Sequence, residues 1–171
     1  GADLEIPQMS EAQQKWWNRF VIKQVQNGYF CAKVPLSLGD LKSTHARELA
    51  QRLEKIGNHS LFFAPNQNMY LRNLSAKNLL SLHDLITQFS TQSAKPAIIG
   101  DMVACTGAAT CQLGIARPRG AVLKIEEYLE DKGLDLDSLQ GFRIQLSGCP
   151  NSCANHFSAN LGFFGKSKRN G

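Results

Sequence analysis

The sequence lacks any uncharged apolar run that approaches the roughly 18 residues of a membrane-spanning helix, and it lacks a basic segment followed by an apolar stretch near its start. It also has no stripe of interleaved aromatic and basic residues of the kind that binds nucleic acid. These absences argue against membrane and nucleic-acid partners. We expect a cytoplasmic protein, with a processed organellar or exported form as the alternative, because the chain begins with Gly1-Ala2 instead of Met.

Acidic residues are few, since 14 Asp and Glu oppose 19 Lys and Arg, and the net charge is +5. A basic chain attracts phosphates and other polyanions, and a ligand with several carboxylates fits the same charge. The basic residues are scattered, as on an ordinary solvated surface. With 43% hydrophobic residues in a chain of 171, the composition is that of a globular protein with one large domain or two small ones.

Five cysteines are present, and four of them form two close pairs. Five residues lie between Cys105 and Cys111, three lie between Cys149 and Cys153, and 37 residues separate the two pairs. Four thiolates brought together select zinc, copper(I) or an iron–sulfur cluster over hard cations. Cys31 stands apart in an apolar run and is expected to be a small buried hydrophobic residue.

Three kinds of site are compatible with the paired cysteines. Two disulfides would constrain little of the unfolded chain, because the members of each pair are close in sequence. Structural zinc sites favour spacings of about two to four residues, which suits Cys149 and Cys153 but not the longer first loop. A [4Fe–4S] cluster also takes four thiolates, and its larger size suits two separate loops in which glycines let the backbone approach.

Apolar periodicity predicts an initial helix and then the order strand, helix, strand, strand, helix. The helix is expected over Glu11–Val25, and Asn27-Gly28 ends it. Asp40 and Ser75 are the predicted N-caps of the two later helices, which end near Ile56 and Phe89. The strands are expected at Tyr29–Pro35, Ser60–Ala64 and Gln67–Asn73. This order predicts an α+β sandwich with helices on one face of a mainly antiparallel sheet.

The rest of the chain has a different character. Residues 90–95 are polar and predict a linker, after which glycines and cysteines cluster in loops. A helix is expected from about Ala121 to Asp131, and strands over Phe142–Leu146 and Ala159–Phe164. The chain stops at Asn170-Gly171, a hairpin-turn signal with no strand after it, which indicates a truncated chain.

The motifs that contain the cysteines are Ala104-Cys105-Thr106-Gly107-Ala108-Ala109-Thr110-Cys111 and Ser147-Gly148-Cys149-Pro150-Asn151-Ser152-Cys153, followed by Leu161-Gly162-Phe163-Phe164-Gly165. Together they closely resemble the cluster and sirohaem signature of the nitrite and sulfite reductase family. The segment Pro65-Asn66-Gln67-Asn68-Met69-Tyr70-Leu71 is similar to one in the family's second ferredoxin-like half. The resemblance covers most of residues 29–171.

The resemblance implies that Cys105, Cys111, Cys149 and Cys153 hold a [4Fe–4S] cluster. It also implies that Cys153 is the proximal ligand of the sirohaem iron, so that one shared sulfur joins the electron store to the reaction centre. An axial thiolate pushes electron density toward a substrate on the opposite face of the macrocycle. The family reaction is the six-electron reduction of nitrite to ammonia or of sulfite to sulfide.

Sirohaem is ringed by carboxylates, which gives the basic residues a use. The implied cofactor-binding candidates are four cations and three residues of the similar segment: Arg72, Arg117, Arg119, Lys166, Asn66, Gln67 and Asn68. The ordinary alternative for each cation is a surface residue, and for the segment it is a turn between two strands. His156 lies near Cys153, but isolated histidines, here also His45, His59 and His83, are usually surface residues.

Family members are roughly three times as long, beyond one modal domain. Their substrate-binding cations come mainly from a first half that this chain lacks, so no catalytic residue is assigned in it. The predicted layout is a leader and helix over 1–28, a ferredoxin-like βαββα half-domain over 29–95, and a [4Fe–4S]- and sirohaem-binding α/β domain over 96–171 that is incomplete at its C-terminus.

The predicted function is that of a piece of an assimilatory reductase, inactive in isolation. Cys105-Thr106-Gly107 and Pro150-Asn151-Ser152 favour nitrite over sulfite as the substrate anion. The expected partners are the missing N-terminal half and an electron donor such as ferredoxin or a flavoprotein. The alternatives are a non-catalytic [4Fe–4S] electron-transfer module, a structural zinc–thiolate domain, and a fold whose thiols bind nothing.

Overall fold

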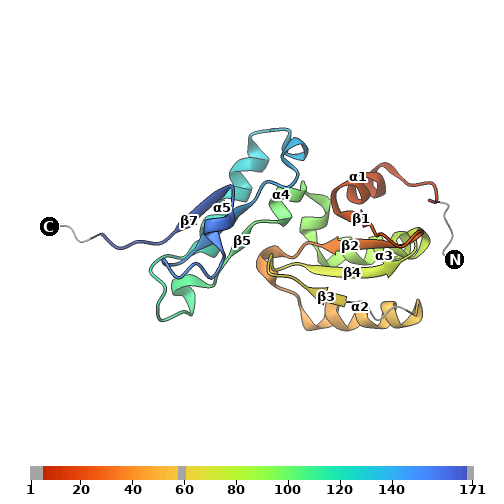
Figure 1. Ribbon diagram of the computed structural model, residues 1–171, viewed down its shortest axis with the longest axis horizontal. Coiled ribbons are helices and arrows are strands. Elements are labelled where there is room, and N and C mark those ends of the chain that lie inside the picture. Colours follow the sequence, from red (N-terminus) through yellow and green to blue (C-terminus); the bar gives the residue numbers. More distant parts are fainter. Residues whose placement is uncertain (1–5, 58–60, 169–171) are drawn as a thin grey trace. The chain divides into compact units, whose positions relative to one another are not determined.

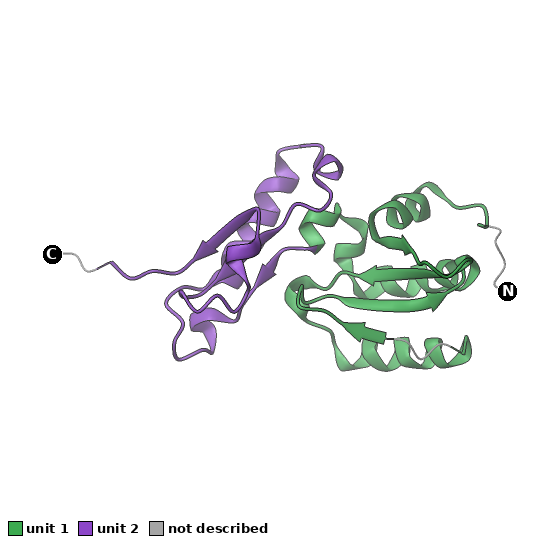
Figure 2. Ribbon diagram, viewed as in Figure 1, with its two compact units in different colours: residues 1–100 green, residues 101–171 purple. Residues whose placement is uncertain are grey.

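The computed structural model describes residues 6–57 and 61–168, and the chain divides into two compact units, residues 1–100 and 101–171 (Figure 2). His59, Ser60 and the dipeptide Asn170-Gly171, for which predictions were made above, lie outside the described residues. Within the described ranges, no helix has both the length and the apolar character that crossing a bilayer requires.

Unit 1 contains an antiparallel sheet with the strand order β1-β2-β4-β3 (Figure 1). Its longer elements are α1 (Glu11–Phe20), β1 (Val21–Lys23), β2 (Phe30–Val34), α2 (Ser43–Lys55), β3 (Leu61–Phe63), β4 (Met69–Leu74), α3 (Ala76–Phe89) and α4 (Ala97–Gly100). From β2 to α3, the order is the predicted strand, helix, strand, strand, helix. The ferredoxin-like half-domain expected from the sequence is therefore present.

The core of unit 1 lies on one face of this sheet. Buried side chains alternate along β2 (Ala32, Val34) and along β4 (Met69, Leu71), as the two-residue period of a strand requires. Helices α1, α2 and α3 each contribute an apolar stripe to the same cluster, from Trp16, Phe20, Leu49, Leu53, Leu79, Leu82 and Ile86.

The first helix is shorter than predicted. It ends at Phe20, and Val21–Lys23 instead forms β1, which pairs with β2 through the turn at Asn27-Gly28. Val21 and Ile22 are β-branched and favour the extended backbone. Because Val21 is also apolar, it continued the apolar pattern of the helix, and the predicted helix was too long.

Two further expectations for unit 1 are wrong. The N-cap of α2 is Lys42, which makes no side-chain cap hydrogen bond, and not Asp40. The polar linker predicted at residues 90–95 is instead a structured part of unit 1, because Thr91–Ala94 form a 3₁₀-helix in which Gln92 and Ser93 are buried. The Ser90 hydroxyl donates to the Pro35 carbonyl, which shows how a polar segment is accommodated in the interior.

Unit 2 is built on a parallel sheet with the strand order β5-β6-β7. Its elements are β5 (Val103–Ala104), α5 (Pro118–Asp131), β6 (Ile144–Ser147) and β7 (Leu161–Phe164). The helix begins three residues earlier than predicted, at Pro118, a residue that is favoured in the first turn of a helix. β6 is buried along its whole length, whereas every residue of the edge strand β7 is exposed.

Candidate functional site

The paired cysteines lie in loops that follow neighbouring parallel strands of unit 2. Cys105 comes directly after β5, and Gly148 and Cys149 come directly after β6. Because β5 and β6 pair in parallel, both loops leave the sheet at the same end, where the carboxyl ends of the strands lie. The carboxyl ends of parallel strands are where open sheets of this kind bind ligands.

Hydrogen bonds join the two cysteine loops. The Cys105 amide donates to the Leu146 carbonyl at 3.2 Å, and the amides of Ile115 and Ala116 both donate to the Gly148 carbonyl at 2.9 Å. The Gly148 amide in turn donates to Cys105 Sγ at 3.0 Å. Backbone amides that donate to cysteine sulfur are one of the means by which a protein supports an iron–sulfur cluster.

Glycine is required where these loops touch. A Cβ atom on Gly148 would lie 2.6 Å from Gly107 Cα, and one on Gly165, just after β7, would lie 2.4 Å from the Gly148 carbonyl oxygen. No side chain fits at such distances, so the glycines of the motifs explain how three loops pack closely at one end of the sheet.

The four thiols differ in exposure. Cys149 is buried, Cys105 is partly buried, and Cys111 and Cys153 are exposed. Within residues 6–57 and 61–168, no three His, Cys, Asp or Glu side chains form a group that holds a single metal ion. By donor type and by the contact between their loops, the cysteines fit a bulkier iron–sulfur cluster, whose thiolates bind different iron atoms.

Two of the predicted cations follow residues that contact the cysteine loops. Arg117 is the exposed N-cap of α5 and comes directly after Ala116, which is hydrogen-bonded to Gly148. Lys166 is exposed and comes directly after Gly165, whose amide donates to the Ser147 carbonyl at 3.0 Å. Arg119 lies in the first turn of α5. The backbone thus brings these positions close to the cysteine loops of unit 2.

The remaining predicted cofactor-binding residues belong to unit 1. Asn66, Gln67 and Asn68 form the turn between β3 and β4, and Gln67 has a left-handed backbone with φ of 62°. The buried Asn68 side chain accepts from the Leu36 amide at 2.9 Å and donates to the Gly100 carbonyl at 2.9 Å. A contact between the Asn68 amide and a cofactor would disturb these bonds. Arg72 lies 5.0 Å above the Phe62 ring.

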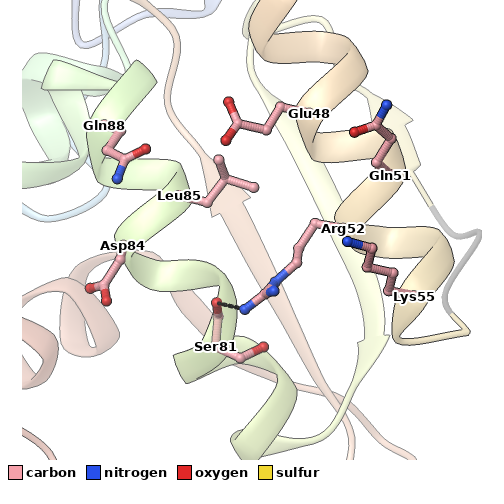
Figure 3. Close-up of a pocket in the computed structure, with 8 residues that line it drawn as sticks. All are labelled: Glu48, Gln51, Arg52, Lys55, Ser81, Asp84, Leu85 and Gln88. Atoms are coloured by element: carbon pink, nitrogen blue, oxygen red, sulfur yellow. Dashed lines mark hydrogen bonds between the residues drawn. The ribbon is translucent and has the colours of Figure 1, made fainter.

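A groove of about 340 Å³ in unit 1 lies between α2 and α3 (Figure 3). Arg52 reaches across it and donates to the Ser81 carbonyl at 3.4 Å. Charged side chains of both signs line the groove, and none of the predicted site residues does. It therefore adds nothing to the candidate site.

Comparison with known proteins identifies the family. The sequence model of the nitrite/sulfite reductase ferredoxin-like half domain matches residues 22–88. The chain is 33% identical over 131 residues to the sulfite reductase [NADPH] hemoprotein beta-component of Bacillus pumilus, a match that covers 72% of this chain and 22% of that protein. The chain belongs to the nitrite and sulfite reductase family.

Two more proteins match over more of the chain. The chloroplastic ferredoxin–nitrite reductase of Spinacia oleracea is 27% identical over 167 residues, or 95% of this chain and 28% of that protein. The structure of the Mycobacterium tuberculosis NirA protein has a TM-score of 0.70 at 25% identity and covers 90% of this chain and 28% of that one. The chain thus spans about a quarter of the length of these relatives.

Sequence reasoning missed the burial of two polar residues beside the cysteines. Ser147, at the end of β6, and His156 are both buried, and their side chains are 2.9 Å apart. His83, also expected at the surface, is buried against Trp16. The signal for His156 was its place three residues after Cys153, but its burial arises from the chain reversal that returns it to β6.

Proposed function

We propose that this chain is the part of a nitrite or sulfite reductase that holds the [4Fe–4S] cluster and offers Cys153 to the sirohaem iron. The observation that supports this most is the pair of cysteine loops at the carboxyl ends of β5 and β6, joined through Gly148, in a chain of this family. In this proposal, residues 29–95 act as the half-domain and residues 96–171 bind the cofactors.

The unequal exposure of the cysteines supports unequal roles. When bound, the cluster and sirohaem supply single-electron storage and a site where the substrate anion is reduced. The chain encloses Cys149, whereas Cys153 is exposed and accessible to a group outside the loop. The Gly148 amide donates to Cys105 Sγ, which holds that sulfur against the second loop. These features suit Cys153, rather than Cys149, to be the sulfur shared between the two cofactors.

The cations near the cysteine loops are placed to pair with the carboxylates of sirohaem. Arg117 and Lys166 are exposed and carry positive charge beside the loops, so they pair with carboxylates by charge-assisted hydrogen bonds. Arg119 is a further candidate on α5, and Arg72, Asn66, Gln67 and Asn68 are candidates from unit 1. The substrate-binding cations lie outside this chain, which accordingly supplies ligands and support instead of acid–base groups.

The proposed reaction is the six-electron reduction of nitrite to ammonia, with electrons from ferredoxin or a flavoprotein. A relative named ferredoxin–nitrite reductase matches 95% of the chain. The second candidate is reduction of sulfite to sulfide, which is favoured by the 33% identity to a sulfite reductase hemoprotein.

Anaerobic reconstitution of the chain with iron, sulfide and sirohaem tests the proposal. We expect four iron and four sulfide atoms for the cluster, with one further iron in the sirohaem, and the absorption bands of both groups. Cys105→Ser should lose the cluster, and Cys153→Ser should lose sirohaem. Cys31→Ser is the matched control and should retain both.

The alternatives give different results in the same experiment. An electron-transfer module takes up the cluster but no sirohaem, and a zinc–thiolate domain takes up zinc without sulfide. Equal cofactor content in the wild-type chain and in Cys153→Ser would contradict the bridging role.

A further inference from the structure

The Ser147 hydroxyl lies where the Cys149–Cys153 loop closes on itself. Its oxygen accepts from the Ala154 amide at 3.3 Å and lies 2.9 Å from His156 Nδ1. Ser147 precedes the loop and Ala154 follows it directly, so these contacts tie the end of β6 to the residue next to Cys153. In either neutral tautomer of His156, the ring nitrogen and the hydroxyl share one proton.

The backbone of this loop contains two residues in the left-handed region. Ser152 and Asn155 both have left-handed conformations, with φ of 58° and 53°. This conformation is unfavourable for a serine such as Ser152 and persists there only where surrounding contacts impose it, whereas an asparagine such as Asn155 tolerates it better. The Asn155 amide donates to the Ser152 carbonyl at 2.7 Å, which closes a tight turn around Cys153.

The His156 ring is fixed from several sides. It stacks on Phe164 with ring centres 5.0 Å apart and contacts Phe157 at 4.1 Å. A Cβ on Gly162 would lie 2.0 Å from the His156 carbonyl oxygen, so only glycine at that point of β7 lets residue 156 pack against the strand.

A histidine is a costly choice for a residue that only packs. Its Nε2 atom is buried and has no hydrogen-bond partner among the described residues, which an apolar ring such as phenylalanine would avoid. The polar atom that makes a contact is Nδ1, and its partner is Ser147.

We infer that His156 is a positioning residue of the cysteine site. Through Ser147 it fixes the two ends of the Cys149–Cys153 loop, and so it sets where the Cys153 sulfur faces. The link to cofactor binding rests on the proposed function, whereas the effect on the loop does not.

Three variants of the full chain separate the hydrogen bond from ring packing. Ser147→Ala and His156→Phe both remove the hydrogen bond between residues 147 and 156, and His156→Phe keeps an aromatic ring. His156→Asn removes the ring but retains a polar group at the place of Nδ1. Hydrogen exchange followed by NMR, without cofactors, reports on the Ala154 and Asn155 amides, and the Cys111 and Gly114 amides of the other loop serve as the internal control.

We expect exchange at Ala154 and Asn155 to rise about tenfold in Ser147→Ala and His156→Phe, to stay near the wild-type rate in His156→Asn, and to stay unchanged at Cys111 and Gly114. Wild-type exchange in His156→Phe would overturn the inference whatever Ser147→Ala shows, because Ser147→Ala also removes the acceptor of the Ala154 amide. A rise confined to His156→Asn would overturn it too. If one histidine variant unfolds, the other decides: the inference requires a rise in His156→Phe and a near wild-type rate in His156→Asn.

Reconstituted samples extend the test to the cluster. Chelator-driven loss of the cluster absorbance should be about tenfold faster in His156→Phe and Ser147→Ala than in His156→Asn, and the electron paramagnetic resonance signal of the reduced cluster should shift in the same two variants. Equal rates and signals in all variants would contradict a positioning role. A wild-type chain that takes up no cluster would refute the proposed function, while hydrogen exchange would still decide the role of His156.

Discussion

Unit 1 buries one continuous cluster of apolar side chains from Trp16 in α1 to Ala97 in α4, whereas the loops of unit 2 depend on hydrogen bonds and on glycines at close contacts. In unit 1 the helices are long and their stripes pack on a sheet. Both units bury polar side chains, among them Asn68 and Gln92 in unit 1 and Gln145 and His156 in unit 2. The difference shows that the half-domain is a conventional scaffold, and that the cysteine unit is organised around its loops.

Truncation of the unit 1 core should have the largest effect. Leu71→Ala, in the fully buried centre of β4, is expected to lower the free energy of unfolding by about 2–5 kcal/mol through lost burial and a cavity. Urea denaturation followed by circular dichroism measures this. Leu123→Ala, at a half-exposed position of α5, is the control and should change stability by no more than about 0.5 kcal/mol.

A methyl group at a close backbone contact should perturb unit 2. Gly162→Ala places a Cβ 2.0 Å from the His156 carbonyl oxygen, so we expect a loss of about 1–3 kcal/mol. Gly120→Ala in α5 is the matched control, because nothing lies within 4 Å of its added Cβ and alanine favours helix. Equal denaturation midpoints for the two variants would contradict the close packing of residue 156 on β7.

Asn68 tests whether unit 1 also relies on a buried polar residue. Asn68→Ala leaves the Leu36 amide and the Gly100 carbonyl without their partner, and should destabilise the chain by about 1–3 kcal/mol. The loss should appear in urea denaturation without any cofactor. Asn66→Ala, whose side chain contacts the Tyr70 hydroxyl in a partly exposed position, should cost less. A stability equal to that of the wild type would show that these two hydrogen bonds do not stabilise the fold, and Asn68 could then contact a cofactor at no cost in stability.

The cysteines of the two units should differ in reactivity. Burial raises the pKa of the Cys31 thiol, and the nearby Arg72 charge partly opposes the rise. At about pH 8 a raised pKa leaves less thiolate, so iodoacetamide should modify Cys31 more slowly than the exposed Cys111. Arg72→Ala should slow Cys31 further and leave Cys111 unchanged, as mass spectrometry of the labelled peptides would show. Faster labelling of Cys31 in that variant would contradict this electrostatic effect.

The order of elements in unit 1 was predictable because each apolar stripe is local in sequence. Ser75 is the N-cap of α3, as predicted, and accepts from the Asn78 amide at 3.3 Å. The end of α1 was not predictable, since Val21 continues the helical period although it lies in a strand. Whether a β-branched residue ends a helix depends on a strand partner, here β2, that lies further along the chain.

The approach of the two cysteine loops in unit 2 was predictable, and the residues that support these loops were not. The cysteine spacings and flanking glycines indicated loops that approach one another, and Gly148 does contact Gly107 and Cys105. The contact between Ser147 and His156 depends on the left-handed turn at Ser152 and Asn155. Neither residue is one that commonly signals such a turn as strongly as glycine, so the reversal was invisible in the sequence.

Strand β7 has a practical consequence for work with this chain. It is an edge strand of its sheet, and Leu161, Phe163 and Phe164 are each nearly half exposed. An exposed apolar strand whose backbone amides and carbonyls are unpaired on one side can pair with a second molecule, so concentrated samples should aggregate through it. Phe163→Lys would place a charge on this strand and should reduce that aggregation without changing the sequence of a cysteine loop.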